Sequence, residues 1–421
     1  MKQGEAARHA AIAALDSILN RHKSFDDAFT EALRGLALEP RDRGFTHTLI
    51  STSLRRKGQC EAAIARHMTK PLPKSAGNAP LILLTAAAQL LYLDVPAHAV
   101  IDVAVTLARR DSHARHFAQL VNAVLRKVAA AGSADLSDTL SAPEWLMTRW
   151  RSAYGYDVAE RIAASHLSEP PLDLSVKEEA EKWSIKVGGT LLPGGTVRVA
   201  NAAAVESLPG FAEGAWWVQD QAAALPVKLL GDVRGFRVLD LCAAPGGKTA
   251  QLAAAGAGVI ALDRSASRMR VLEGNLARLG LAARTVVADA LAYDPGYLFD
   301  AILLDAPCSA TGTIRRHPEL PYLRSEADIA KLGALQDRLL DRAGQWLKPG
   351  GMMVYCTCSL ERAEGEDRID AFLAARPEFV RIPITSGDVS GQPSFITELG
   401  DMRTFPFMDL DGFYAARLRR R

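Results

Sequence analysis

Two short motifs place cysteines at the ends of apolar segments in the second half of the chain. The first is DAPCS at residues 305–309, and the second is CTCS at residues 356–359. Each follows a strand-like run, so we expect both at the carboxyl edge of one sheet, where open α/β sheets bind ligands. A glycine-containing loop, DLCAAPGGKT at residues 240–249, precedes them. Thiols beside a nucleotide-type loop predict covalent chemistry next to a bound cofactor.

The loop has the features of an adenosine site. An apolar strand is predicted before it and a helix from Lys248 onward, so its small residues would let a ligand approach free N–H groups of the main chain. Asp263 ends the second strand, 23 residues after Asp240, where a carboxylate suits a ribose diol. Asp289 ends the third strand and is predicted to meet the adenine edge.

A phosphate-binding loop is the main alternative. Residues 242–249 match the pattern G-x-x-x-x-G-K-T except at Cys242, and residues 301–305 resemble the strand that holds magnesium in P-loop NTPases. Against this interpretation, the missing glycine is needed for the bend of the loop, and Asp263 would have no task at a phosphate. The pattern G-x-G-x-x-G of dinucleotide sites is absent.

The residues Asp305, Cys308 and Cys358 fit the methylation of a pyrimidine ring carbon. Carbon 5 of cytosine is a poor nucleophile until a thiolate adds to carbon 6. This chemistry needs an ionisable cysteine, an acid at the edge of the base, and a proton acceptor. An enzyme that methylates an amino group would instead place an aromatic residue after Pro307. A sulfonium donor with an adenosine group, S-adenosylmethionine, fits the loop and the acids.

The remaining cysteines are predicted to pack in the interior. Cys60 and Cys242 are interpreted as small buried side chains, and Cys356 is expected to point opposite to Cys358 along its strand. Zinc is not predicted, because the pair at 356 and 358 lacks a second close pair and a nearby histidine.

Composition and patterning divide the 421 residues into parts. The net charge of +2 is unevenly spread: residues 1–130 carry +7 and the rest −5. The first part has helical spacing, and its basic surface indicates either an anionic partner or an ordinary solvated face. Strands alternate with helices after residue 215, which predicts a parallel sheet. The predicted strands span 236–241, 259–262, 285–288, 301–304 and 352–356.

The chain carries no sign of export. It has no apolar run long enough to cross a bilayer, and residues 1–6 do not resemble a signal peptide. Five cysteines, an odd number, do not indicate a disulfide framework. We expect a cytoplasmic protein with reduced thiols and no membrane partner.

These segments resemble the RsmB-type (Sun or Fmu) bacterial ribosomal RNA cytosine-C5 methyltransferases. The similarity is carried by residues 239–249, 305–312, 315–319 and 357–359, supported by 217–221 and 411–414. Residues 95–99 and 121–126 are similar to the NusB-like domain fused to such enzymes. The resemblance implies an all-α NusB-like domain (1–135), a small α+β connector (136–214) and a Rossmann-like methyltransferase domain (215–421).

The resemblance also assigns roles. Cys358 would be the nucleophile, Cys308 would assist breakdown of the adduct, and Asp305 would bind the base edge near the methyl donor. The cofactor S-adenosylmethionine would be held by the following residues: Cys242, Ala243, Ala244, Pro245, Gly246, Gly247, Lys248, Asp263, Asp289 and Asp305. The residues alone do not rank the two cysteines, because DNA cytosine methyltransferases use the cysteine after the proline, which here is Cys308.

The implied substrate is one cytosine of small-subunit (16S) ribosomal RNA, bound by a monomer without a metal. Basic residues predicted to contact the RNA are Arg55, Arg56, Lys57, Arg109, Arg110, Arg126, Lys127, Arg315 and Arg316. For each of them the alternative is a solvated helix end. A P-loop NTPase and a non-catalytic RNA-binding assembly factor remain the alternative functions.

Overall fold

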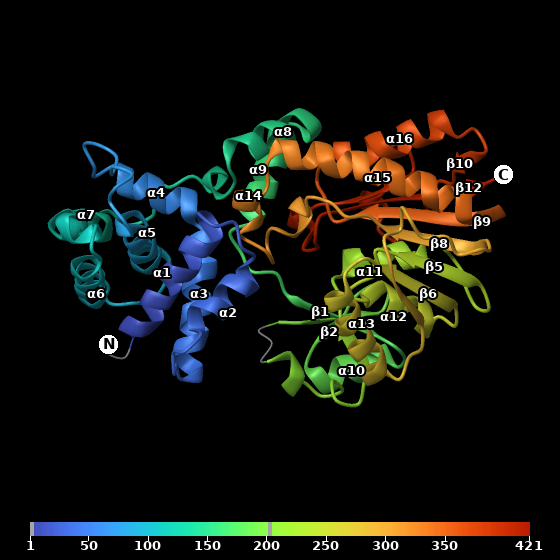
Figure 1. Ribbon diagram of the computed structural model, residues 1–421, viewed down its shortest axis with the longest axis horizontal. Coiled ribbons are helices and arrows are strands. Elements are labelled where there is room, and N and C mark those ends of the chain that lie inside the picture. Colours follow the sequence, from blue (N-terminus) through green and yellow to red (C-terminus); the bar gives the residue numbers. More distant parts are fainter. Residues whose placement is uncertain (1–3, 201–203) are drawn as a thin grey trace. The chain divides into compact units, whose positions relative to one another are not determined.

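The computed structural model describes residues 4–200 and 204–421. These residues form two compact units (Figure 1). The first contains the chain up to Ser168 together with Ile314–Ser325, and the second contains Glu169–Thr313 and Glu326–Arg421. Compactness alone does not test the predicted boundaries after residues 135 and 214, which stay predictions.

The first unit is helical, as the spacing of its apolar residues predicted. Its core is built around fully buried aliphatic side chains such as Leu15, Ile50 and Leu125. Ser24 shows how local chemistry begins a helix, because its side chain accepts the backbone N–H of Asp27. The helices are α1 (Glu5–Leu19), α2 (Phe25–Leu33), α3 (Pro40–Arg55), α4 (Lys57–Ala65), α5 (Ala79–Tyr92), α6 (Ala97–Arg110), α7 (Ala118–Ala131), α8 (Glu144–Tyr154) and α9 (Tyr156–Ser165).

A short segment from the second half of the sequence completes this unit. It contains α14 (Leu320–Leu323) and begins at Ile314, five residues after the DAPCS motif. The Tyr322 hydroxyl donates to the carbonyl of Leu54 at 3.0 Å. The buried guanidinium of Arg55 donates to three backbone carbonyls, those of His166 (2.8 Å), Ser168 (3.1 Å) and Arg315 (3.0 Å). Arg55 therefore joins three stretches of chain that are distant in sequence.

The second unit is organised around a mixed sheet in the order β10-β12-β9-β8-β5-β6-β7. The five predicted strands are present and mutually parallel; three of them are longer than predicted, the first begins one residue later, and the third is shifted by one residue. They are β5 (Arg237–Leu241), β6 (Gly258–Asp263), β7 (Arg284–Val287), β8 (Phe299–Asp305) and β9 (Leu347–Thr357). The antiparallel strands were not predicted: β10 (Phe379–Arg381), β11 (Met402–Thr404) and β12 (Phe413–Arg420). The predicted fold class is confirmed, with this antiparallel edge added.

Helices cover both faces of the sheet (Figure 1), which explains why its central strands are continuously apolar. Ile302 and Leu304 of β8 face α15 (Glu326–Trp346) and α16 (Glu366–Ala375), whereas Ala301 and Leu303 face α11 (Gln221–Lys228) and α12 (Gly247–Ala254). Helix α13 (Ala266–Leu279) packs beside β6. Because these strands are parallel, their carboxyl ends meet at one edge of the sheet.

A small antiparallel sheet precedes the large one in sequence, where an α+β connector was predicted. Its order is β2-β3-β1-β4, with β1 (Leu172–Val176), β2 (Thr190–Leu191), β3 (Thr196–Val199), β4 (Trp216–Val218) and the helix α10 (Ala180–Val187). The buried Asp173 carboxylate pairs with Arg198 at 2.7 Å and accepts the backbone N–H of Gln221 at 3.2 Å. This carboxylate connects the small sheet to the start of α11.

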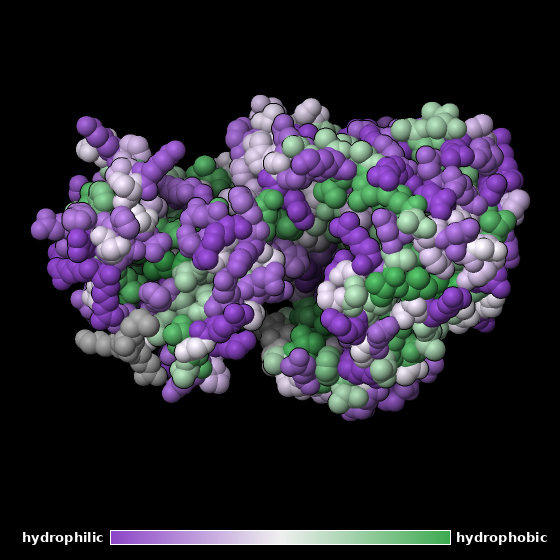
Figure 2. All heavy atoms as spheres, viewed as in Figure 1, coloured by the Kyte–Doolittle hydropathy of each residue, from purple (hydrophilic) through white to green (hydrophobic). Residues whose placement is uncertain are grey.

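Hydrophilic residues predominate on the face shown in Figure 2, with smaller apolar areas between them. Within residues 4–200 and 204–421, every helix is too short or too polar to cross a membrane.

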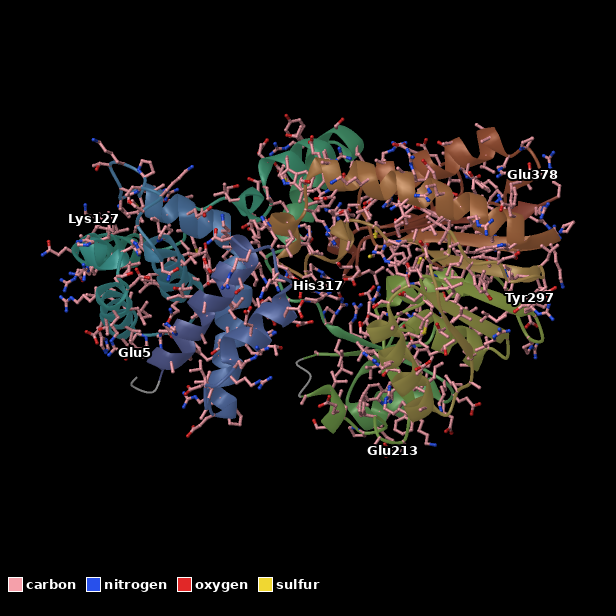
Figure 3. The ribbon with its side chains drawn as sticks, viewed as in Figure 1. Glu5, Lys127, Glu213, Tyr297, His317 and Glu378 are labelled. Atoms are coloured by element: carbon pink, nitrogen blue, oxygen red, sulfur yellow. The ribbon has the colours of Figure 1, made fainter. Side chains whose placement is uncertain are left out.

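Replacing Arg55 by alanine should destabilise the first unit. The substitution leaves buried carbonyls at residues 166 and 315 without their donor, so we expect a loss of roughly 3 kcal/mol in the free energy of unfolding. Urea unfolding followed by circular dichroism measures it. Lys127→Ala is the matched control, because Lys127 is exposed on α7 (Figure 3) and should leave the midpoint unchanged. Equal midpoints for both variants would contradict a structural role for Arg55.

Candidate active site

The loop after β5 turns sharply between the strand and α12. Cys242 and Gly246 have φ of 61° and 103°, in the left-handed region. Gly246 is required there for a second reason, since a Cβ atom would lie 2.6 Å from Cγ of Leu272 on α13. The backbone of Ala243 donates to the carbonyl of Leu262 at 3.1 Å, which ties the loop to the neighbouring strand. The loop therefore has a fixed shape with its main chain close to the sheet edge.

Acidic side chains stand at this edge, as the sequence predicted. Asp263, at the end of β6, is buried and accepts the backbone N–H groups of Ser265 (2.8 Å) and Ala244 (3.2 Å). Arg268 lies 3.8 Å from the same carboxylate. Asp289 follows β7, is exposed, and accepts the N–H of Leu291 at 2.9 Å. Asp263 thus contacts the loop directly, whereas Asp289 follows the neighbouring strand and binds within its own turn.

Asp240 on β5 is the most deeply buried acid of the group. The Thr249 hydroxyl donates to its Oδ2 at 2.6 Å, and among the described residues its Oδ1 has no partner. Burial raises the pKa of Asp240 to about 7, although the hydrogen bond from Thr249 opposes the shift. The side chain links β5 to α12 beneath the loop.

These features fit an adenosine-containing ligand. The fixed loop leaves no room for a side chain at Gly246, and α12 begins directly after it with backbone N–H groups at its first turn. Each carboxylate oxygen has two lone pairs, so Asp263 retains acceptor capacity for a diol after binding two N–H groups. This set of donors and acceptors is compatible with binding of a nucleoside.

The two predicted cysteines meet at the same edge. Strands β8 and β9 are parallel neighbours with Asp305 paired to Cys356, so the loops that follow them leave the sheet together. The sulfur atoms of Cys308 and Cys358 lie 3.5 Å apart, and both side chains are partly exposed. The hydrogen bond with Cys358, followed by burial and the charge of Glu364, raises the pKa of Cys308 well above its ordinary value. The structure therefore favours Cys308 as a neutral thiol beside Cys358.

The third cysteine of this region is part of the interior. Cys356 is fully buried against the layer of α11 and α12, as predicted, and its sulfur lies 3.6 Å from Oδ1 of Asp305. The prediction that it points opposite to Cys358 is wrong, because residues two positions apart along an extended chain face the same side, and both cysteines pack in the same apolar cluster. Burial, then the charge of Asp305, raises the pKa of Cys356 well above that of an ordinary thiol. Cys60 is buried, as predicted, and burial raises its pKa to about 12. Cys242 is only half-buried, contrary to the prediction, although burial raises the pKa of its thiol as well. These thiols are poorly suited to nucleophilic attack.

A partly buried ion pair connects the loop with the cysteine motifs. Lys248 Nζ lies 2.9 Å from Oδ2 of Asp305 and 4.9 Å from the centre of the Phe413 ring. Burial opposes the charge of Lys248, but the carboxylate of Asp305 outweighs it and raises the pKa of Lys248. The sequence placed both residues at the edge without indicating that they pair. Their contact brings the three predicted segments into one site.

Two glycines allow the cysteine loop to pack against the end of the chain. A Cβ atom on Gly312 would overlap the carbonyl oxygen of Gly412. The N–H of Gly412 donates to the carbonyl of Gly312 at 2.8 Å, and the N–H of Gly312 donates to the carbonyl of Cys358 at 3.0 Å. Gly412, in the segment 411–414 that the sequence marked without assigning a task, thus packs against the loop of Cys308, which in turn binds the loop of Cys358.

The residues predicted to bind RNA lie in several environments. Arg55 and Arg315 are buried, and Arg55 is occupied by backbone carbonyls. Arg56 stacks on Tyr92 at 4.5 Å. Lys57 pairs with Glu61 at 2.6 Å. Arg316 is half-buried, as are Arg56 and Lys57, whereas the exposed members are Arg109, Arg110, Arg126 and Lys127.

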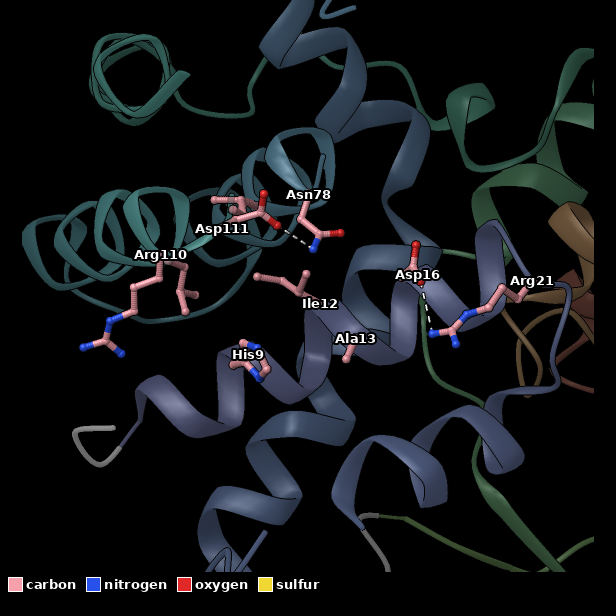
Figure 4. A pocket seen from close by; sticks show the side chains of 10 residues that line it. His9, Ile12, Ala13, Asp16, Arg21, Asn78, Arg110 and Asp111 are labelled. Atoms are coloured by element: carbon pink, nitrogen blue, oxygen red, sulfur yellow. Dashed lines mark hydrogen bonds and ion pairs between the residues drawn. The ribbon is translucent and has the colours of Figure 1, made fainter. Parts of the chain in front are cut away.

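Arg110 also borders a pocket of about 580 Å³ in the first unit, shown in Figure 4. It pairs with Glu5, and the same pocket contains Arg21 paired with Asp16 at 3.1 Å. Asn78 donates to Asp111 at 2.9 Å across the pocket. The charged side chains that line the pocket therefore bind mostly to neighbouring side chains of the same unit.

One buried carboxylate at the site was missed by sequence reasoning. Glu364 lies in a polar run that follows the CTCS motif, and nothing in that run distinguishes it from Glu361 or Glu366. It contacts both cysteine loops through Ser309 and Ser359. Within the described residues, no cluster of three or more histidine, cysteine or acidic side chains has the arrangement of a metal site.

Known protein families match both parts of the chain. The model of the 16S rRNA methyltransferase RsmB/F family matches residues 227–419, and the NusB family model matches residues 5–130. Ribosomal RNA small subunit methyltransferase B of Pseudomonas syringae pv. tomato is 37% identical over 437 residues, covering 98% of this chain and 96% of that protein. The protein of the same name from Xanthomonas campestris pv. campestris is 34% identical over 433 residues, covering 99% and 97%.

Two solved structures are similar to the chain in fold. The crystal structure of PH0851 superimposes with a TM-score of 0.78 and 25% identity, covering 99% of each chain. A methyltransferase homologue from Pyrococcus horikoshii has a TM-score of 0.58 and 27% identity, covering 68% of this chain and 98% of that one.

The buried acid Asp240 should make stability depend on pH. Its pKa rises from the ordinary 3.8 to about 7 on folding, so its stabilising contribution is complete below the lower value and is lost as the pH rises through the higher one. Asp240→Asn cannot ionise, and its stability relative to the natural protein should increase by up to about 4 kcal/mol between about pH 4 and about pH 8.

Urea unfolding at both pH values measures this difference, with Asp289→Asn as the control on an exposed carboxyl group. A difference between the natural protein and Asp240→Asn that does not change with pH would show that Asp240 does not titrate in this range.

Proposed function

The chain belongs to the RsmB/F family of 16S rRNA methyltransferases, and from this premise we propose that it methylates carbon 5 of a cytosine in small-subunit ribosomal RNA through a covalent adduct with Cys358. Membership of the family makes it an S-adenosylmethionine-dependent rRNA methyltransferase with a NusB-type helical domain. The observation that supports the finer proposal is the pair of thiols 3.5 Å apart, beside the ion pair of Lys248 and Asp305.

The loop and its acids are the proposed cofactor site. The backbone of residues 242–248 would hold the ligand close to α12, with Asp263 at the ribose and Asp289 at the adenine edge. S-adenosylmethionine, when bound, supplies the electrophilic methyl group. Asp305 would stand between cofactor and base, because it ends β8 next to both Lys248 and Cys356.

The two thiols have different proposed roles in the reaction of the base. The Cys358 sulfur forms a bond to carbon 6, and the electron pair of the double bond moves toward carbon 5. Asp305 binds the polar edge of the ring, which stabilises the adduct. After carbon 5 has gained its methyl group, it loses its proton and the bond between sulfur and carbon 6 breaks, which restores the ring and frees the thiolate.

Cys308 is the proposed acceptor or relay for that proton. Two thiols in contact do not both ionise readily, and contact with Cys358 is the first cause of the raised pKa of Cys308. Once the Cys358 sulfur is bonded to carbon, it no longer carries a negative charge that opposes ionisation of Cys308. Cys308 can then release its own proton to solvent and, as the thiolate, accept the proton that carbon 5 must lose.

The NusB-type helices are the part of the chain proposed to bind the RNA backbone. Exposed cations for this task are Arg109, Arg110, Arg126 and Lys127, of which Arg110 also pairs with Glu5. The target cytosine must leave its stack to reach Cys358. Ribosomal RNA as substrate and five free cysteines support a cytoplasmic location, and the monomeric state stays a prediction.

Replacing Cys358 by alanine should abolish methylation. We expect the rate of methyl transfer to 16S rRNA to fall by roughly 1,000-fold or more, because the thiol proposed to form the bond to carbon 6 is missing. Transfer of a radiolabelled methyl group measures the rate, and calorimetry should show unchanged binding of S-adenosylmethionine. Cys60→Ala is the matched control, since this cysteine is buried in α4 of the first unit. Full activity of Cys358→Ala would exclude the nucleophile assignment.

A further inference from the structure

A single carboxylate joins the two cysteine loops. Glu364 lies in a short 3-10 helix, Arg362–Glu364, between β9 and α16, and is fully buried. Its carboxylate accepts hydrogen bonds from Ser309, the residue after Cys308, and from Ser359, the residue after Cys358. Each of the two cysteines is therefore followed directly by a serine that is hydrogen-bonded to the same buried carboxylate.

The contacts fix both loops tightly. Ser309 donates its backbone N–H to Oε1 at 2.9 Å, and its hydroxyl donates to Oε2. The Ser359 hydroxyl donates to Oε2 at 2.6 Å. The amide of Gln336 on α15 reaches Oε1 at 3.3 Å and the carbonyl of Pro307 at 2.8 Å. The carboxylate thus gathers donors from the two loops and from the helix behind them.

Glu364 is itself anchored to β9, the strand that ends directly before Cys358. The hydroxyl groups of Tyr355 and Thr357 donate to its backbone carbonyl at 2.8 and 3.4 Å. Both the main chain and the side chain of Glu364 are held by hydrogen bonds, so a movement of Ser309 relative to β9 would break some of them. A buried carboxylate oxygen without a donor lowers the stability of the fold. The separation of the two loops is thereby set by one residue.

The charge state of Glu364 is tied to these contacts. Burial raises the pKa of Glu364, and the hydrogen bonds from Ser309 and Ser359 oppose this shift. Four donors converge on its two oxygens, a number that an ionised carboxylate accepts and a protonated or amidated group does not. The charge also contributes to the raised pKa of Cys308.

We propose that Glu364 is a positioning residue that holds the sulfur atoms of Cys308 and Cys358 at their working separation. This inference rests on the proposed covalent function of the two thiols. Glu364 acts through the serines and does not touch the base, so it is required for the rate of the chemical steps rather than for binding of RNA or cofactor. A displacement of about 1 Å at reacting groups costs about 100-fold in rate.

A second buried carboxylate in the same unit provides a matched control. Asp401 is fully buried, accepts the Tyr414 hydroxyl at 2.6 Å and pairs with Arg381 at 3.2 Å. Its contacts with Tyr414 and Arg381 lie outside both cysteine loops. Asp401→Asn therefore reports the general effect of removing a buried charge, and Glu364→Gln adds the specific effect on the thiols.

The test compares Glu364→Gln with Asp401→Asn in the full chain. Amidation keeps the size of the side chain but replaces one acceptor by a donor facing Ser309 or Ser359. We expect kcat for methylation of 16S rRNA to fall about 100-fold in Glu364→Gln, with KM for RNA and the Kd for S-adenosylmethionine within about twofold. Adduct formation with RNA containing 5-fluorocytidine, which cannot release its carbon-5 substituent as a proton, should slow in parallel. Asp401→Asn should change kcat far less.

The outcomes separate this inference from the proposed function. An equal change of kcat in Glu364→Gln and Asp401→Asn would overturn the positioning role. A natural protein that forms no adduct with the fluorinated RNA would overturn the covalent function instead. If Glu364→Gln does not fold, Ser309→Ala and Ser359→Ala each remove one contact, and both should lower kcat at unchanged KM. Full activity of both serine variants would also contradict the inference.

Discussion

The parallel pairing of β8 with β9 is the constraint on which the site depends. Because Asp305 lies opposite Cys356 in the register, the loops after the two strands start side by side, and the thiols of Cys308 and Cys358 meet 3.5 Å apart. A shift of one residue would turn one motif toward the opposite face of the sheet. Helices on both faces of the sheet bury apolar residues from adjacent positions of these strands, so the register is fixed by the core itself.

Charged side chains, buried or partly buried, hold the loops of the site in the positions that the strand register gives them. Lys248 and Asp305 connect the cofactor loop to the cysteine edge, and Glu364 joins the cysteine loops to each other. Asp240 accepts the hydroxyl of Thr249 and so connects β5 to the first turn of α12, on either side of the loop. Charges in such places reduce stability unless they are paired or hydrogen-bonded, so their presence at one edge of the sheet indicates selection for function rather than for folding. The close packing of Gly312 on Gly412 holds the assembly against the last strand.

Sequence reasoning found what local patterns encode. Apolar runs that end in an acid or a cysteine predicted the parallel strands, and the small residues of the loop predicted the turn into α12. It missed contacts between residues distant in sequence: the antiparallel strands β10–β12, the partnership of Lys248 with Asp305, and the burial of Arg55 against carbonyls of residues 166 and 315. Glu364 was missed for the same reason, because its donors come from separate loops.

The proposed reaction depends on a bond between Cys358 and the target base, and mass spectrometry of a trapped complex tests for this bond most directly. Cys308→Ala, incubated with 16S rRNA and S-adenosylmethionine, should accumulate the adduct, since the thiol proposed to accept the carbon-5 proton is missing. After denaturation and digestion, we predict a cytosine-derived mass on the peptide that contains Cys358. A nucleotide attached to another cysteine, or the absence of any adduct, would contradict the account.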